Sequence, residues 1–179
     1  MEAGKWRAEI IDRRLIVSPL PVFWHELARN WLFRGLRDAC AEKGWMPDQA
    51  GEIKLPAKND LIEPDLMVLR DEASLQNLES TRPLDRVLLV AEIATHSSIR
   101  EDREIKPLAC ALAGVPHYLV IDRFTTPMTV SLFSAPGDGG YARIETVCLG
   151  RKLRLPEPFD VTLDTASLPS RRRGDLPSE

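Results

Sequence analysis

The sequence IEPDLMVL at residues 62–69 and the sequence RVLLVAEI at residues 86–93 decide the fold class of this chain. Each contains an apolar run of strand length, which is typical of β-strands that are buried on both faces. Each run also has an acid at one end, Asp65 in the first and Glu92 in the second. A buried carboxylate is costly unless a cation compensates it, so we expect the two acids to share a divalent cation, a proton or a basic partner. Lys106, a short helix-sized step downstream, is the candidate basic partner.

The flanking sequence predicts two helices. Apolar residues recur at helical spacing across residues 23–43, and Gly44 is a suitable left-handed stop. Trp24 and Trp31 share one face of this helix, where we expect them to pack in the core rather than to stack on bases. The second helix is predicted around residues 100–113. We place its proline, at position 107, in the first turn, where a missing N–H is not needed.

The remaining pattern predicts strands, and their order indicates an α/β protein with a mixed β-sheet flanked by helices. A strand, a helix and a strand between residues 86 and 122 imply a right-handed crossover in a parallel or mixed sheet. The other predicted segments are an N-terminal hairpin with arms at 8–11 and 15–17, a strand at 52–55, a polar loop at 70–83, a strand at 117–122, a hairpin with arms at 128–133 and 142–147, and an edge strand at 159–163.

Length and composition limit the domain organisation and the compartment. The chain has 179 residues, of which 44% are hydrophobic, and it fits one globular domain. We place this domain at residues 1–168 and expect residues 169–179 to be a disordered tail. No apolar run approaches a membrane span, and the start of the chain carries an acid where a secretory signal needs an apolar core. We therefore expect a cytoplasmic protein with no membrane partner.

The cysteines and the charge exclude some classes of site. Cys40, Cys110 and Cys148 lack the close spacing of zinc ligands, so we expect free thiols in packed positions. The formal net charge of −3 argues against a protein that holds long nucleic acids by charge alone. Basic residues do cluster locally, and solvated faces together with a polar tail are the favoured explanation of these clusters. The clusters are Lys5, Arg7, Arg13 and Arg14; Arg29, Arg34 and Arg37; and Arg171, Arg172 and Arg173.

Six short motifs between residues 8 and 168 follow an order and spacing found in one known family. They are EIID with LIVSP near the N-terminus, then PD at 64–65, EI at 92–93, DREIKP at 102–107, AGVPHY at 113–118 and PFDVTLD at 158–164. In this order they resemble the Uma-type restriction endonuclease family, which is part of the PD-(D/E)XK nuclease superfamily. Each motif is short, but their joint order argues against a chance match.

The resemblance implies a restriction-endonuclease-like fold and a metal-dependent site that cleaves phosphodiester bonds. In such a site Asp65 is the motif aspartate and Glu92 the second acid, and both would bind Mg²⁺ or Mn²⁺ through hard oxygen ligands. The superfamily lysine two residues after the second acid is Ala94 here. The resemblance assigns that role to Lys106, from the following helix, which would orient the attacking water or stabilise the developing negative charge.

Two further residues are candidates for this site. Glu9 could be another metal ligand or a water-positioning acid. His25 could approach the substrate phosphate, although a histidine in the first turn of an amphipathic helix is as often a capping or packing residue. A catalytic triad of Ser97 or Ser98 with His96 and Asp102 is disfavoured, because no glycine-rich nucleophile turn surrounds the serines.

Three positions depart from the family pattern. Asp12-Arg13 stands where the family usually has a glycine, Cys110 replaces a tyrosine, and Leu119 replaces a tryptophan. They lie beside the proposed site, so they affect substrate positioning more than the metal ligands.

We therefore predict a Mg²⁺-dependent DNA endonuclease that acts as a homodimer. A small domain offers few phosphate contacts, and pairing two subunits would double them. The alternative is a nuclease fold retained as a nucleic-acid-binding or protein-interaction module without turnover. Asp65, Glu92 and Lys106 favour the enzyme, because a pure binder has no need to hold two carboxylates near a phosphate.

Overall fold

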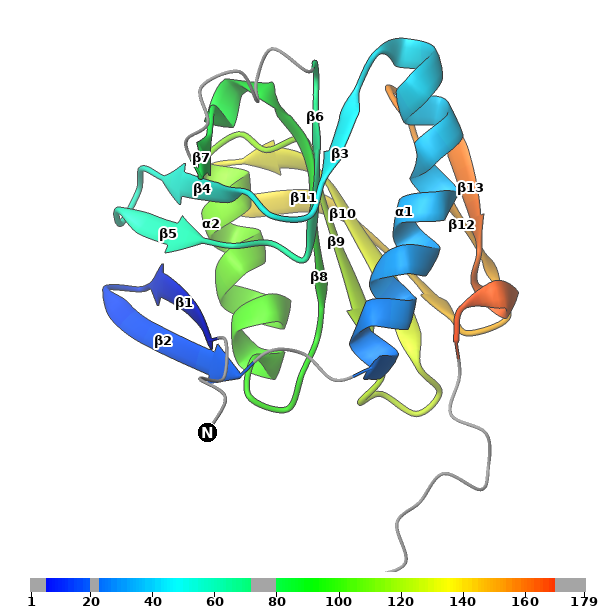
Figure 1. The fold of residues 1–179 in the computed structure, drawn as a ribbon, viewed down its shortest axis with the longest axis horizontal. Helices are drawn as coiled ribbons and strands as arrows, with labels where there is room; N and C mark the ends of the chain where they lie inside the picture. The colour runs from blue at the N-terminus through cyan, green and yellow to red at the C-terminus, as the bar shows by residue number, and fades with distance from the viewer. Residues whose placement is uncertain (1–5, 20–22, 72–79, 170–179) are drawn as a thin grey trace, which may run out of the picture.

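The structure is a computed structural model, and it describes residues 6–19, 23–71 and 80–169 (Figure 1). Within these residues the main sheet has six strands in the order β11-β10-β9-β8-β6-β3. Its strands β8 and β9 are parallel and its other neighbours are antiparallel, so the predicted mixed sheet is confirmed. The strands are β3 (Met46–Asp48), β6 (Leu66–Leu69), β8 (Val87–Ile93), β9 (His117–Asp122), β10 (Thr129–Gly137) and β11 (Gly140–Cys148).

A second sheet packs over the main one and begins with the predicted N-terminal hairpin. Its order is β2-β1-β5-β4-β7. Ile11 pairs with Arg14 across the hairpin, which leaves Asp12 and Arg13 as a two-residue turn with φ values of 51° and 62°. Two left-handed residues are what a type I′ turn requires. The strands are β1 (Trp6–Ile11), β2 (Arg14–Pro19), β4 (Glu52–Leu55), β5 (Asp60–Ile62) and β7 (Thr81–Arg82).

Helix α1 (Phe23–Lys43) has the predicted bounds and is followed by Gly44 at a φ of 67°. Its apolar stripe faces the main sheet, and Trp31 is in the core as predicted, whereas Trp24 is only partly buried. The buried residues of the helix are His25, Ala28, Trp31, Leu32, Leu36 and Cys40. Apart from the adjacent pair Trp31 and Leu32, they follow one another at three or four positions, which is the spacing of one helical face.

The second helical segment lies on the other side of the main sheet and contains a widened turn. A π-helical turn, η3 (Glu101–Ile105), runs directly into α2 (Lys106–Leu112), so Pro107 lies in the first turn of α2 as predicted. Short 3₁₀ turns occur at η2 (Leu84–Arg86) and η4 (Thr165–Ser167). Single π turns inside helices are rare and are frequent at functional sites.

The buried strands β6, β8 and β9 divide the core into two parts. Side chains such as Leu66 and Leu89 face α1, and alternate ones such as Met67 and Val90 face α2 and the second sheet. All residues of these three strands are buried, which confirms the expectation from their continuous apolar sequence. Figure 1 shows α1 and α2 on opposite sides of these strands.

Some sequence predictions are corrected by the structure. The segment predicted as an edge strand forms β13 (Val161–Asp164), which pairs with β12 (Lys152–Leu155) in a separate two-stranded sheet. The segment predicted as a polar loop, residues 70–83, contains β7, and η2 follows it directly. Residues 72–79 of this segment lie outside the described residues, as do residues 170–179 of the predicted tail. Cys148 is exposed rather than packed, although all three thiols are free. Among the described helices, none is long and apolar enough to cross a membrane.

Candidate active site

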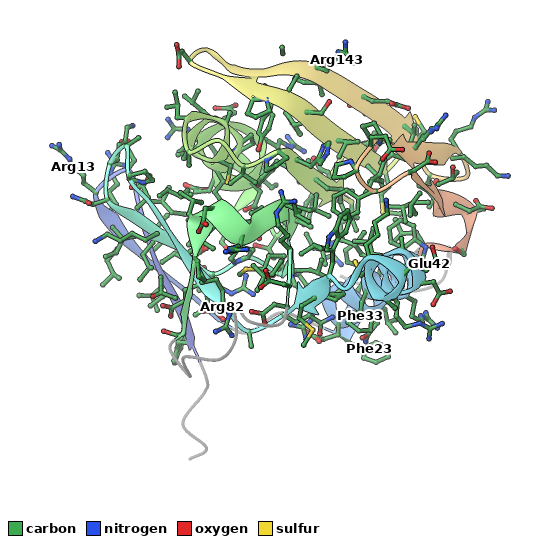
Figure 2. The ribbon with its side chains drawn as sticks, turned by 90° about the horizontal axis from the view of Figure 1, so that it is seen from above. Arg13, Phe23, Phe33, Glu42, Arg82 and Arg143 are labelled. Carbon is green, nitrogen blue, oxygen red and sulfur yellow. The ribbon has the colours of Figure 1, made fainter. Side chains whose placement is uncertain are left out.

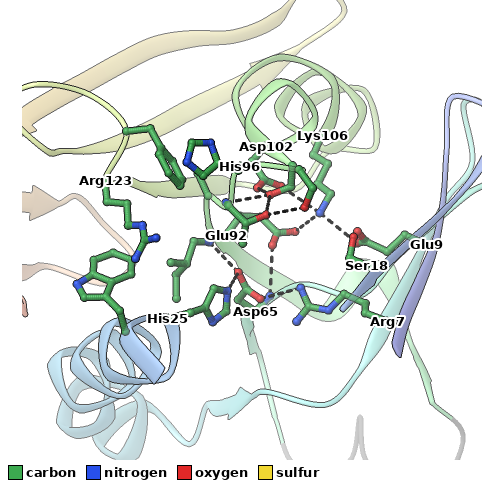
Figure 3. A pocket seen from close by; sticks show the side chains of 17 residues that line it. Arg7, Glu9, Ser18, His25, Asp65, Glu92, His96, Asp102, Lys106 and Arg123 are labelled. Carbon is green, nitrogen blue, oxygen red and sulfur yellow. Dashed lines mark hydrogen bonds and ion pairs between the residues drawn. The ribbon is translucent and has the colours of Figure 1, made fainter. Parts of the chain in front are cut away.

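A cavity of about 290 Å³ lies where the N-terminal hairpin meets the starts of α1, α2 and β6 and the end of β8 (Figure 3). The five predicted site residues all line it, together with further polar side chains. The predicted residues are Glu9, His25, Asp65, Glu92 and Lys106. The fold therefore brings together residues from both sheets and from both faces of the main sheet.

Asp65 and Glu92 are held side by side by the pairing of β6 with β8. The antiparallel register places Leu66 opposite Ala91, so Asp65, which precedes Leu66, lies beside Glu92, which follows Ala91. The carboxylate of Asp65 accepts a hydrogen bond from the backbone N–H of Ile93 at 2.7 Å, and Glu92 accepts one from the N–H of Asp65 at 3.4 Å. Both side chains are almost fully buried, so their orientation is fixed by the backbone of the sheet.

Lys106 lies among three carboxylates. Its Nζ is 3.0 Å from Glu92 Oε1, 3.1 Å from Glu9 Oε1 and 3.1 Å from Asp102 Oδ1. The predicted proximity of Lys106 to Glu92 is therefore confirmed. Glu9 also accepts the backbone N–H of Glu63 at 3.0 Å, which fixes this acid from the second sheet. The ammonium donates a hydrogen bond to Glu92 and forms ion pairs with Glu9 and Asp102.

Asp65 is bound by two basic side chains on the opposite side of the cavity. Arg7 Nη1 lies 2.7 Å from Asp65 Oδ1, and His25 Nε2 lies 3.0 Å from Asp65 Oδ2. His25 is buried and comes from the first turn of α1, and Figure 3 shows it pointing at Asp65. The structure thus places His25 on the motif aspartate, and its contact with a substrate phosphate stays a prediction.

The acids of the cavity outnumber its permanent cations. Burial raises the pKa of Glu92 well above its usual value; Lys106 opposes this shift, and the charges of Asp65, Asp102 and Glu9 add to it. Burial likewise raises the pKa of Asp102. Burial would lower the pKa of Lys106, but the charges of Glu92, Asp102 and Glu9 outweigh it and hold that pKa well above its usual value. The cluster therefore tends to retain a proton on an acid while the ammonium stays charged.

Asp65 behaves differently from its neighbour. Burial would raise its pKa, but His25, Arg7 and the N–H of Ile93 outweigh burial and hold the pKa of Asp65 below its usual range. The two acids of the predicted metal pair thus differ in charge preference, because Asp65 contacts two basic side chains and an N–H group, whereas Glu92 is buried, contacts one ammonium and lies within the field of three further acids. Such a divergence between neighbouring titratable groups is common at functional sites.

Arg7 and Asp102 are functional candidates that the sequence analysis did not assign. Arg7 was grouped with a basic cluster, but it alternates with Glu9 along β1, and this period of two places both on the face toward the cavity. Asp102 was considered only for a triad, yet it lies four residues before Lys106. That spacing on a helix is the signal for an ion pair.

The disfavoured catalytic triad is not assembled. Ser98 donates to Asp102, but His96 stacks on Phe124 with ring centroids 4.2 Å apart. Ser97 shares a hydrogen bond with Thr95 at 3.2 Å. Among the described residues these contacts give no serine activated by a histidine.

The donor chemistry of the cavity fits a divalent metal, but several of the carboxylate oxygens already contact basic side chains. Carboxylate oxygens are the ligands that Mg²⁺ prefers, and a divalent cation would balance the excess of acids. However, the oxygens of Asp65 are bound by Arg7 and His25 and one oxygen of Glu92 by Lys106. Within the described residues no group of three or more His, Cys, Asp or Glu side chains is arranged to hold a metal ion. A bound cation would therefore compete with the basic side chains for these oxygens.

Comparison with known proteins agrees with the fold and the motifs. The chain resembles a crystal structure from Anabaena variabilis of a protein described as a putative nuclease belonging to DUF820, with a TM-score of 0.71 and 14% sequence identity. The match covers 90% of this chain and 88% of that chain, and it shows a shared fold. No curated protein sequence matches significantly. The Uma2 family, described as putative restriction endonuclease, matches residues 1–166, so this chain belongs to the Uma2 family.

Proposed function

We propose that the chain is a cytoplasmic endonuclease that uses Mg²⁺ or Mn²⁺ to hydrolyse DNA phosphodiester bonds. The observation that carries the proposal is the buried group of Asp65, Glu92 and Lys106 at the wall of one cavity. Burying this many charged groups costs stability, and packing alone would not require it. Membership in the Uma2 family supports the same reaction class.

The roles follow from chemistry and position. Asp65 and Glu92 would hold the metal, which when bound polarises a phosphoryl oxygen and acidifies a water molecule. Lys106 orients the water or stabilises the developing negative charge, for which its ammonium must turn away from at least one of its three carboxylates. Glu9 positions the ammonium through its contact with Lys106. His25 would reach a phosphate only by leaving Asp65.

The direct test is cleavage of plasmid duplex and circular single-stranded DNA with Mg²⁺, with Mn²⁺ and with chelator. We expect products only with metal. Intact DNA under all conditions, with protein that is folded by circular dichroism, would contradict the proposed activity.

We expect Mg²⁺ or Mn²⁺ to stabilise the fold. A cation that binds the folded state alone should add about 2.7 kcal/mol to the free energy of unfolding at a concentration of 100 times its dissociation constant. Thermal melts across a metal titration measure this effect, and calorimetric titration counts the bound ions. Absence of metal uptake by the wild type would contradict the site.

Two variants give opposite expectations in the same titration. Asp65→Ala removes a ligand, so the stabilisation by metal should vanish. Arg7→Met removes the cation that lies 2.7 Å from Asp65, so metal should bind more tightly than in the wild type. Equal metal affinity in Arg7→Met and wild type would show that the metal does not compete for Asp65.

The alternative is a binding module without turnover. One observation favours it: the basic side chains already occupy the oxygens that a metal would use. Under this alternative, DNA binding would persist without metal-dependent cleavage, so the cleavage and metal titrations separate the two functions.

We also expect a homodimer whose two sites face one DNA duplex, with weak and salt-sensitive binding. The hairpin β1–β2 exposes Trp6, Leu15 and Val17, which offer an apolar surface to a second subunit. Light scattering at micromolar concentration measures the mass, and titrations between about 50 and 200 mM salt measure the ionic part of binding. A monomer whose DNA binding ignores salt would contradict this picture.

A further inference from the structure

A second cavity, of about 560 Å³, lies beside the candidate active site. The two cavities share four lining residues, which we call the shared wall: Trp24, His96, Arg123 and Phe124. Three of these side chains have aromatic faces and one is a guanidinium. The rest of the second cavity is lined by Thr125, Thr126, Pro127, Met128 and Leu149. A path of neutral and aromatic surface therefore leads away from the acid cluster.

The side chains of the shared wall contact one another. The guanidinium carbon of Arg123 lies 5.0 Å from the ring centroid of Trp24 and 5.1 Å from that of Phe124. The ring of His96 lies 4.2 Å from that of Phe124. These are distances of cation–π and aromatic contacts, which hold the groups in defined orientations. In Figure 3 Arg123 and Arg7 lie on opposite sides of the acid cluster.

The backbone also fixes the shared wall. The indole N–H of Trp24 donates to the carbonyl of Pro169 at 2.8 Å. The turn after β9, which carries Arg123 and Phe124, is held by the N–H of Phe124 donating to Asp122 at 2.9 Å. Arg103 pairs with the same aspartate. The shared wall is thus built on a rigid turn and a helix start.

The shared wall lies at the edge of the two cores and is partly open, because Trp24 and Phe124 pack against core residues without being fully buried. His96 is exposed, and Trp24, Arg123 and Phe124 are half-buried. An exposed histidine on a half-buried phenylalanine contributes little to a core, whereas flat faces at a cavity wall are what an unstacked base contacts.

We propose that the shared wall binds one unstacked nucleotide of the substrate, next to the bond that is cut. The base stacks on the aromatic faces, and Arg123 binds the adjoining phosphate. The inference rests on the proposed nuclease function and specifies its substrate as a strand with a base out of the helical stack. In a regular duplex the base faces are covered by neighbouring pairs, so only an unstacked base can use such a wall.

Charge supports this mode of binding. The chain has a net charge of −3, and the acid cluster repels the phosphate backbone. Stacking supplies affinity that does not depend on neutralising phosphates, whereas a planar guanidinium braced by aromatic rings offers paired donors to a single phosphate. The unstacked base could come from a single strand or from a base extruded from a duplex.

The test measures binding without cleavage. Fluorescence anisotropy in chelator compares a labelled oligothymidylate with a labelled hairpin duplex. The variants are Phe124→Leu, Arg123→Gln and the exposed His96→Ala. Matched controls are Phe23→Leu and Arg143→Gln, which replace exposed residues outside both cavities (Figure 2). Thermal melts confirm that each variant is folded.

We expect Phe124→Leu to weaken single-strand binding by about 5- to 150-fold, the range of one base–aromatic stack. Its salt dependence should not change. Arg123→Gln should instead lower the salt slope by about 0.7, the value for one phosphate contact on a single strand. His96→Ala should weaken binding without destabilising the fold, because His96 is exposed. Both controls should bind as the wild type does.

The outcomes separate the inference from the proposed function. If the variants bind only the single strand more weakly, the substrate is single-stranded. If they bind the duplex more weakly to the same extent, the base is extruded from a duplex. Wild-type affinity in all three variants, or no binding of either DNA, would overturn the nucleotide site. The cleavage assay above judges the nuclease activity independently, because it does not require the shared wall to bind a base.

Discussion

Lys106→Met is expected to lower the free energy of unfolding by about 3–5 kcal/mol at pH 7, because it leaves buried carboxylates without their cation. The ammonium has acids at 3.0–3.1 Å on three sides and is almost fully buried, so water cannot replace it. Urea denaturation measures the change. Lys152→Met, on the exposed position of β12, is the matched control and should change stability by less than about 0.5 kcal/mol.

The loss in Lys106→Met should depend on pH. Without the ammonium, the already raised pKa values of Glu92 and Asp102 rise further in the folded state. The folded state then binds more protons than the unfolded state above the unfolded carboxyl pKa, so stability falls as pH rises. We expect the variant to be closer to the wild type at pH 5 than at pH 7. The same deficit at both values would show that lost packing, rather than unpaired charge, causes it.

Glu92→Gln is expected to reduce metal-dependent cleavage by about 100- to 1000-fold without destabilising the fold. The amide keeps the shape of the side chain but cannot offer a charged oxygen to a divalent cation. Lys106 retains its ion pairs with Glu9 and Asp102. Single-turnover cleavage under saturating metal measures the activity, and Glu104→Gln, an exposed acid on η3, is the matched control.

The difference in free energy of unfolding between Glu92→Gln and the wild type should change with pH in one direction. Because the folded pKa of Glu92 lies above its unfolded value, its ionisation costs the wild type stability as pH rises from the unfolded pKa through the folded one. The amide removes this cost, so the variant should gain relative to the wild type as pH rises. An inactive variant that is also unfolded at pH 7 would leave no support for a catalytic role and would assign Glu92 to structure.

The long elements could be predicted from the sequence because each carries its own signal. The apolar stripe of helix α1 determines which face of the helix is buried, and Gly44 determines where the helix ends. Strands β6, β8 and β9 are continuous apolar runs. The three-residue strands β3 and β5 are too short for any periodicity, and β13 pairs with β12 through contacts that no local pattern specifies.

The candidate site was predictable where acids interrupt apolar strands, and less so where a residue depends on distant packing. Asp65 and Glu92 are conspicuous because a charged group in a buried strand requires a reason. From the sequence alone, Arg7 resembles an ordinary surface arginine. The pairing of β1 with β5 turns the face of β1 that carries Arg7 toward the cavity, and no local pattern indicates this pairing. The shared wall could not be predicted either, since Trp24 fits a core stripe and Arg123 and Phe124 lie in a turn.

The hairpin β1–β2 has a consequence for how the protein is made. It supplies Arg7 and Glu9 to a cluster whose other members include Lys106, far along the chain. During synthesis the hairpin leaves the ribosome long before its partners, so these contacts close late, as non-local pairings generally do. We expect the nascent chain to have no assembled acid cluster until α2 has docked, which would delay any nuclease activity until folding is nearly complete.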